Sequence, residues 1–234
     1  MKQTVLVVSC EHAVNTVPPD FNYVFLQHQS LLSNYQASDL GAARIAQQIS
    51  NELGCDLTQS GVTRLLIDCN RSLSHSRCFS KFTKSLSNTE KKLLINQYYL
   101  PFRQQTKDII DSHIAANKQV LHLSVHTFAP LLKGFRHNAG IGLLYDSLRH
   151  GEKEVARLWH GLLLQETPTY RVRLNYPFPG NSDSFTKTLR SHYTQRDYLG
   201  IEMDINQALL ISPAAESEVA YALSHSLEEL LQLL

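Results

Sequence analysis

Residues 4–10, TVLVVSC, form a continuous apolar run near the start of the chain. A run of this kind predicts a strand buried on both faces, as in a parallel sheet covered by helices on both sides. Stretches with strand character then alternate with stretches of helical periodicity along the whole chain. We therefore expect an α/β fold with a mostly parallel mixed central sheet, and no linker or repeat divides the single domain predicted over residues 1–234.

The remaining elements follow from periodicity and from capping residues. Further strands are predicted at 63–69, 119–126, 140–146, 170–175 and 198–206, and helices at 38–54, at 153–165, from Ser87 past a kink near Pro101, and from Ser212 to the C-terminus. Ser38 and Gly54 are the expected caps of the first helix. Ser87 and Glu90 have the spacing of a capping box, and Ser212–Pro213 has the pattern of a helix start.

Charge and hydropathy exclude several classes of protein. The chain carries 22 basic and 21 acidic residues, so no electrostatic footprint for nucleic acid or for an anionic membrane is present. No apolar run approaches the roughly 20 residues that span a bilayer. The N-terminus lacks a small-residue cleavage site, so we interpret it as the first core strand and expect a cytosolic protein.

The four cysteines are Cys10, Cys55, Cys69 and Cys78. Their spacing matches no zinc-ribbon or CxxC pattern, and we expect free thiols in a reducing compartment. Cys10 precedes His12 by two residues, which places both side chains on one face of an extended strand. A thiol nucleophile paired with that histidine is therefore an alternative to be tested.

Several predicted strands end on residues that can do chemistry. Glu11 and His12 follow the first strand, "DCNR" (68–71) ends the second, His126 ends the third, and Glu202 and Asp204 lie on the last. Ligands of open parallel sheets bind beyond the carboxyl ends of the strands. We therefore expect these side chains to converge on one site.

The residue types at these strand ends suit a metal-dependent hydrolase. Two histidines and one carboxylate are a common ligand set for catalytic zinc. A separate glutamate can move a proton from water to a leaving nitrogen. The fork of an arginine beside an asparagine matches a substrate carboxylate.

A further group of basic residues lies in "RVRLNYPFPGNSDSFTKTLR" (171–190). Arg173 and Arg190 are candidates to bind a second substrate carboxylate or to polarise the scissile carbonyl. The loop "PFPGNSDS" (177–184) has the composition of a binding loop.

The ordered set of motifs resembles the N-formylglutamate amidohydrolase family. It comprises "EHAVNTVP", "SDLGA", "RLLIDCNRS", "SVHTFAP", "IGLLYD", "RVRLNYPF", "LR" and "GIEMDINQ", from about residue 6 to 207. A wider resemblance extends to the zinc carboxypeptidases and aspartoacylase. The resemblance implies a three-layer α/β/α fold of the phosphorylase/hydrolase kind, zinc or another divalent metal, and deacylation of an N-acylated acidic amino acid.

The resemblance also implies roles for individual residues. His12 and His126 become metal ligands, and Asn70 and Arg71 bind the substrate carboxylate. Glu202 becomes the general base, so Glu202 and Arg71 are the expected catalytic residues.

One position departs from the wider pattern of His-x-x-Glu, because Asn15 stands three residues after His12. We expect Glu11 to supply the missing carboxylate, with Asp39 as the alternative.

The function predicted from the sequence is removal of a formyl or other short acyl group from a small N-acyl amino acid such as N-formylglutamate. Two alternatives stay open. One is a peptidase or aminoacylase of the same fold, and the other is a non-catalytic binding domain that has lost the metal. The sequence predicts neither a nucleic-acid partner nor a membrane partner, and it does not indicate an oligomeric state.

Overall fold

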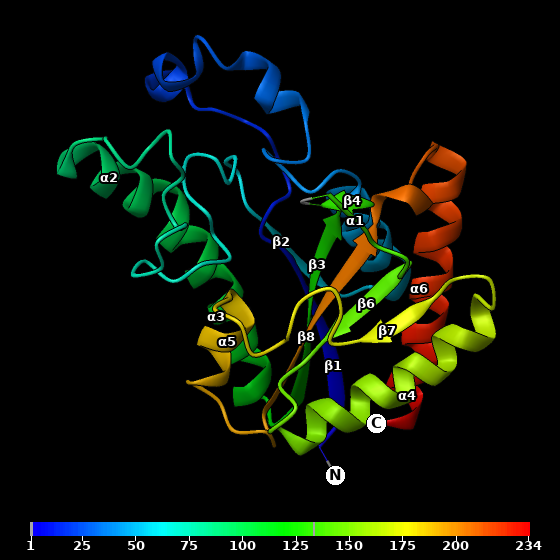
Figure 1. Cartoon of the computed structure of the whole chain (residues 1–234). Helices are drawn as coiled ribbons and strands as arrows, with labels where there is room; N and C mark the ends of the chain where they lie inside the picture. The colour runs from blue at the N-terminus through cyan, green and yellow to red at the C-terminus, as the bar shows by residue number, and fades with distance from the viewer. Residues whose placement is uncertain (1, 133) are drawn as a thin grey trace.

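The computed structural model describes residues 2–132 and 134–234, and its centre is a six-stranded sheet (Figure 1). The strands lie in the order β2-β1-β3-β8-β6-β7. Their bounds are β1 Thr4–Cys10, β2 Asp56–Gln59, β3 Gln119–Phe128, β6 Ile141–Leu144, β7 Val172–Leu174 and β8 Tyr198–Asn206. Neighbouring strands are parallel except β6 and β8, which are antiparallel. A separate two-stranded ribbon joins β4 (Leu131–Leu132) to β5 (Phe135–Arg136).

Helices cover both faces of the sheet and make three layers (Figure 1). Helices α1 (Ala42–Leu53), α4 (His150–Glu166) and α6 (Pro213–Leu233) lie on one side, and α2 (Asn88–Leu94), α3 (Leu100–Ala115) and α5 (Phe185–Arg190) lie on the other. Three short 3-10 segments, Pro19–Phe25, Gln29–Ser33 and Gln207–Leu209, complete the fold. This arrangement confirms the predicted α/β architecture with a mixed, mostly parallel sheet.

The two faces of the sheet differ in chemistry. On the side of α1, α4 and α6, alternate residues of β1, β3 and β8 contribute apolar side chains to one core, from Leu6 and Leu121 to Ile205. On the other side, Val7, Val120 and Tyr198 join an apolar core with α3 and α5 at the amino ends of the strands. Further along the same strands this face becomes polar and carries Ser9, His122, Ser124, His126, Glu202 and Asp204, all of them buried.

The capping predictions were mostly confirmed. The Ser87 side chain and Glu90 form a capping box, and the Ser212 hydroxyl accepts from the backbone nitrogen of Ala215 at the start of α6. Gly54 ends α1 in the left-handed region with φ of 61°. Near Pro101 the helix changes type, because a π-helical turn over Ile95–Tyr99 separates α2 from α3.

Two predictions were wrong. The first helix begins at Ala42 with Gly41 as its cap, so residues 38–41 form a loop and Ser38 is not the cap. The segment 63–69 is not a strand but a buried series of turns, in which the Thr83 hydroxyl donates to the carbonyl of Leu66. On the side of β1 away from β3, the neighbouring strand is instead the polar edge strand β2.

A search of the described residues for a membrane-spanning helix found none with the required length and hydrophobicity.

Candidate metal centre and active-site cavity

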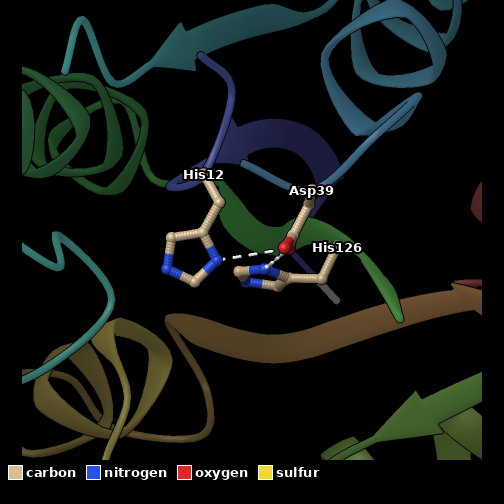
Figure 2. Close-up of side chains that lie close together, drawn as sticks. All are labelled: His12, Asp39 and His126. Atoms are coloured by element: carbon tan, nitrogen blue, oxygen red, sulfur yellow. Dashed lines mark hydrogen bonds and ion pairs between the residues drawn. The ribbon is translucent and has the colours of Figure 1, made fainter. Parts of the chain in front are cut away.

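Three buried side chains converge at the carboxyl end of the sheet: His12, Asp39 and His126 (Figure 2). Asp39 Oδ2 lies 3.2 Å from His12 Nδ1 and 2.8 Å from His126 Nδ1. Each residue offers one ligand atom, and these atoms all lie within 4.8 Å of one another. Two imidazole nitrogens and one carboxylate oxygen at this separation match the donors of a catalytic metal site with a position left for water.

Each member of the cluster is placed by a different part of the fold. His12 follows the end of β1, and His126 is near the end of the neighbouring strand β3. Asp39 comes from the loop before α1, where its backbone nitrogen donates to the carbonyl of His12 at 3.0 Å. The two imidazole rings meet edge to face with centroids 4.9 Å apart.

Opposite charges hold the cluster together. Burial alone would raise the pKa of Asp39, but Arg64 and His12 hold it well below its usual value. Burial also opposes the charged form of His126, yet hydrogen bonds to Asp39 and Glu11 raise its pKa well above the usual value. The pKa of His12 is raised by Asp68 and Asp39 against the effect of burial. Without a metal the site therefore favours protonated imidazoles between carboxylates.

Glu11, the expected carboxylate ligand, lies outside this cluster, and Asp39, the alternative, takes its place. The backbone turns after Cys10, and Glu11 is buried behind His126 with its Oε2 3.1 Å from Nε2 of that ring. Burial would raise the pKa of Glu11, but contacts with His126 lower it to about 2. Glu11 contacts Nε2 of His126, whereas Asp39 contacts Nδ1 on the other side of the ring, so Glu11 does not face the point at which the three side chains meet.

Asn70 connects the cluster to Glu202. Its Nδ2 lies 3.2 Å from His126 Nε2 and 3.5 Å from Glu202 Oε2, and its Oδ1 accepts from the backbone nitrogen of Phe185. The Thr186 hydroxyl donates to the other oxygen of Glu202. Glu202 is therefore a fixed acceptor beside the cluster, 8% exposed and facing the same cavity.

The cluster forms part of the wall of a cavity of about 430 Å³. Asn70, Arg71 and Glu202 also line it, together with Ser182 and Asp183 from the loop predicted to bind ligand. Arg71 donates to the backbone carbonyl of Asp183, which fixes its guanidinium at the wall. The structure thus brings the predicted binding loop (177–184) together with six residues that the sequence predicted for the site: His12, Asp39, Asn70, Arg71, His126 and Glu202.

Arg173 and Arg190 are not in that wall, which corrects their predicted role. Arg190 is 8% exposed, and its guanidinium donates to Glu152 at 3.0 Å and to the carbonyls of Gly180 and Gly200. Arg173 is exposed and lies over the ring of Tyr176, with 5.2 Å to the centroid. All three guanidinium nitrogens of Arg190 donate to groups of the fold, and none of them faces the cavity wall.

The cavity contains three residues to which the sequence gave no role in the site. Arg64 donates to Asp39 Oδ1 at 2.8 Å, and Arg77 is an exposed guanidinium that lines the cavity. Asp204, placed at the strand end without a role, is 6% exposed, and burial raises its pKa to about 7. Arg64 is the first residue of the motif "RLLIDCNRS", but nothing in that motif indicated a role for it, and Arg77 lies in none of the quoted motifs. For Asp204 the available signal was its position two residues after Glu202.

Comparisons with known proteins place the chain in a family. No curated protein sequence matches it significantly. Gene product Atu2144 from Agrobacterium tumefaciens has a similar structure, with a TM-score of 0.82, 23% identity, and coverage of 99% of this chain and 92% of the other. The N-formylglutamate amidohydrolase from Ralstonia eutropha JMP134 superposes with a TM-score of 0.71 and 16% identity, covering 98% and 94% of the two chains. The family model for N-formylglutamate amidohydrolase matches residues 4–211. The resemblance seen in the motifs is confirmed, and the chain belongs to the N-formylglutamate amidohydrolase family.

Proposed function

We propose that this protein is a zinc-dependent hydrolase that removes a short acyl group from an N-acylated acidic amino acid such as N-formylglutamate. The observation that carries the proposal is the buried cluster of His12, Asp39 and His126 on the wall of a cavity, beside a fixed glutamate. Zinc is the proposed metal because two imidazoles and a carboxylate are a common catalytic set for it.

The reaction divides between the metal and Glu202. When bound, a divalent metal polarises the substrate carbonyl and lowers the pKa of a water molecule towards neutrality. Glu202 accepts a proton from the attacking water and transfers it to the leaving nitrogen. Water adds to the acyl carbon, the C–N bond breaks, and the products are a carboxylic acid and a free amino acid. Thr186 and Asn70 hold the Glu202 carboxylate in place for both transfers.

Substrate recognition rests on the arginines of the cavity. Asn70 and Arg71 are proposed to hold the α-carboxylate, because an arginine fork matches carboxylate geometry. Arg77 is our candidate for a second carboxylate, since it is exposed and lines the same cavity. It replaces Arg173 and Arg190 in that role, and it makes a dicarboxylate substrate the preferred one.

A second candidate activity differs only in the acyl group. A further cavity of about 490 Å³ shares His12 and Arg71 with the first and is lined by the rings of Tyr35, Phe128 and Phe178. A one-carbon formyl group leaves most of that space unused. The aromatic wall therefore favours an aminoacylase for larger acyl groups as the alternative.

The thiol mechanism receives no support from the position of Cys10. The side chain is fully buried in the apolar core on the α1 and α6 side of the sheet, and burial raises the pKa of the thiol well above its usual value. The free cysteines among the described residues suit the reducing cytosol, which we keep as the proposed location.

The first test is the metal content of the purified protein, with His126→Ala in parallel. We expect about one zinc per chain in the wild type and a large loss in the variant. His225→Ala is the matched control, because His225, Glu166 and Glu229 form a second, partly exposed group with ligand-like geometry on α4 and α6. Metal that disappears in His225→Ala instead would assign the bound ion to that group.

The second test is kcat/KM on N-formyl-, N-acetyl- and N-benzoylglutamate, with N-formylleucine to measure the contribution of the second carboxylate. Preference for the formyl compound supports the proposed function, and preference for the benzoyl compound supports the aminoacylase. Absence of turnover on every compound by zinc-loaded protein would refute both.

A further inference from the structure

Each histidine of the cluster has its second ring nitrogen against another carboxylate. His126 Nε2 lies 3.1 Å from Glu11 Oε2, and His12 Nε2 lies 2.7 Å from Asp68 Oδ1. In both rings it is therefore Nδ1 that faces Asp39. The same arrangement is built twice, from residues far apart in the sequence.

The hydrogen bonds around Glu11 decide which nitrogen of His126 carries a proton. The hydroxyls of Ser9 and Ser124 donate to the two Glu11 oxygens at 2.6 and 2.7 Å. A serine hydroxyl has one hydrogen, so Ser124 has none left for His126 Nε2, which lies 3.0 Å from its oxygen. His126 Nε2 must then be the donor, towards Ser124 and the Glu11 carboxylate. Asn70 Nδ2, which lies 3.2 Å from the same nitrogen, is also a donor and therefore donates to Glu202 Oε2 and not to the ring.

The chain of hydrogen bonds continues into the core. The single hydroxyl hydrogen of Ser9 is likewise donated to Glu11. His122 Nε2, 2.8 Å from the Ser9 oxygen, must therefore donate to it. His122 Nδ1 then accepts from the Tyr198 hydroxyl, also at 2.8 Å. Tyr198 and His122 are both fully buried. Every hydrogen bond from Tyr198 to Glu11 points in one direction, and Glu11 is the acceptor where the chain ends.

The second arrangement is shorter. Asp68 Oδ1 accepts from the backbone nitrogen of Asn70 at 3.0 Å as well as from His12 Nε2. His12 Nδ1 is left facing Asp39 Oδ2 and Arg64 Nη1, each at 3.2 Å.

We propose that Glu11 and Asp68 are positioning residues that keep the proton of His126 and His12 on Nε2 and present both Nδ1 atoms to one metal ion. The inference rests on the proposed metal site. Glu11, which the sequence predicted to be a metal ligand, then has a different function: it orients the ligand His126 by accepting from the ring nitrogen that faces away from the metal. Carboxylates of this kind typically change metal affinity by about 10–100-fold when they are removed.

The direct test is a long-range proton–nitrogen-15 spectrum of the histidine rings in zinc-loaded wild-type protein. We expect two histidines with a protonated Nε2 and an Nδ1 resonance shifted by the metal. In the chelator-treated protein we expect the metal-induced shift of both Nδ1 resonances to be lost. A metal-shifted Nε2 on either His12 or His126 would overturn the proposal without any variant being made.

The variants E11Q and D68N then test each carboxylate separately. We expect E11Q to change the ring signals of His126 alone, D68N to change those of His12 alone, and each to weaken zinc binding about 10–100-fold in competition with a chromophoric chelator. The matched control is E216Q, whose glutamate pairs with Arg44 on the surface. Unchanged affinity in both variants would contradict the proposal.

Cobalt distinguishes positioning from direct ligation. The visible spectrum of bound Co²⁺ reports its ligands, so a band shape unchanged from wild type in E11Q supports positioning, and an altered one makes Glu11 a ligand. None of these measurements uses turnover. Loss of the proposed hydrolase activity and failure of this inference therefore give separate results.

Discussion

The Asp204 carboxyl lies on β8 in the wall of the cavity and is almost completely buried. Burial raises its pKa from 3.8 to about 7; His126 opposes the rise, and Asp39 and Glu202 add to it. The unfolded chain has no such burial, so the folded protein holds this proton more tightly than the unfolded chain. Stability of the metal-free protein should therefore fall as the pH rises from about 4 to about 7.

The size of the effect follows from the two pKa values. A rise from 3.8 to about 7 corresponds to about 4 kcal/mol of stability lost once Asp204 is ionised. D204N keeps the shape of the neutral acid and cannot ionise. We expect the variant to equal the wild type near pH 4 and to exceed it by up to about 4 kcal/mol at pH 8.

Urea unfolding of both proteins in the presence of a chelator measures this difference, with D20N as the control because Asp20 is exposed. Added zinc should reduce the advantage of D204N, since a cation near His126 favours the ionised Asp204. An advantage of equal size at pH 5 and pH 8, or a variant less stable than wild type at pH 8, would refute the desolvation argument.

Three other substitutions or treatments test the remaining assignments. R190A removes one of the two arginines that lie 3.0 Å from the fully buried Glu152, the other being Arg149, and should cost up to about 3–5 kcal/mol in urea unfolding, without raising the KM of the protein that remains folded. G142A places a Cβ 1.8 Å from the carbonyl oxygen of Tyr176, so we expect more than about 4 kcal/mol of destabilisation, measured as a fall in Tm. Iodoacetamide should leave Cys10 unmodified in the native protein by mass spectrometry, because the thiol is buried and its pKa is raised.

The sequence predicted which strand ends lie together better than it predicted which carboxylate lies between the two histidines. His12, His126 and Glu202 were placed by a local signal, a strand with chemistry-bearing residues at or near its end. Asp39 carries no such signal, because its position depends on a backbone hydrogen bond to His12 from a distant loop. Glu11 was preferred because it is adjacent to His12, but adjacent side chains leave the backbone in different directions.

The segment 63–69 shows why an apolar run alone does not identify a strand. Leu66 and Ile67 are fully buried, as a strand reading requires. The backbone of this segment, however, bonds to residues 78–83 instead of to a neighbouring strand: the Ser80 and Thr83 hydroxyls donate to the carbonyls of Leu65 and Leu66. An apolar composition predicts that a segment is buried. It does not predict which groups hydrogen-bond to the backbone of that segment, and this second property decides whether the segment is a strand.

The alternation of polar and apolar residues in β3 and β8 has a meaning that depends on topology. "HLSVH" (122–126) and "GIEMD" (200–204) have the pattern of strands with one face in water. Both strands lie in the middle of the sheet, and all these residues are buried. Buried polar groups destabilise a fold unless each is paired, and here the apolar side chains on the opposite face supply the core that offsets this. An alternating strand at the centre of a mostly parallel sheet is therefore a signal of a functional site, because solvent exposure no longer explains its polar residues.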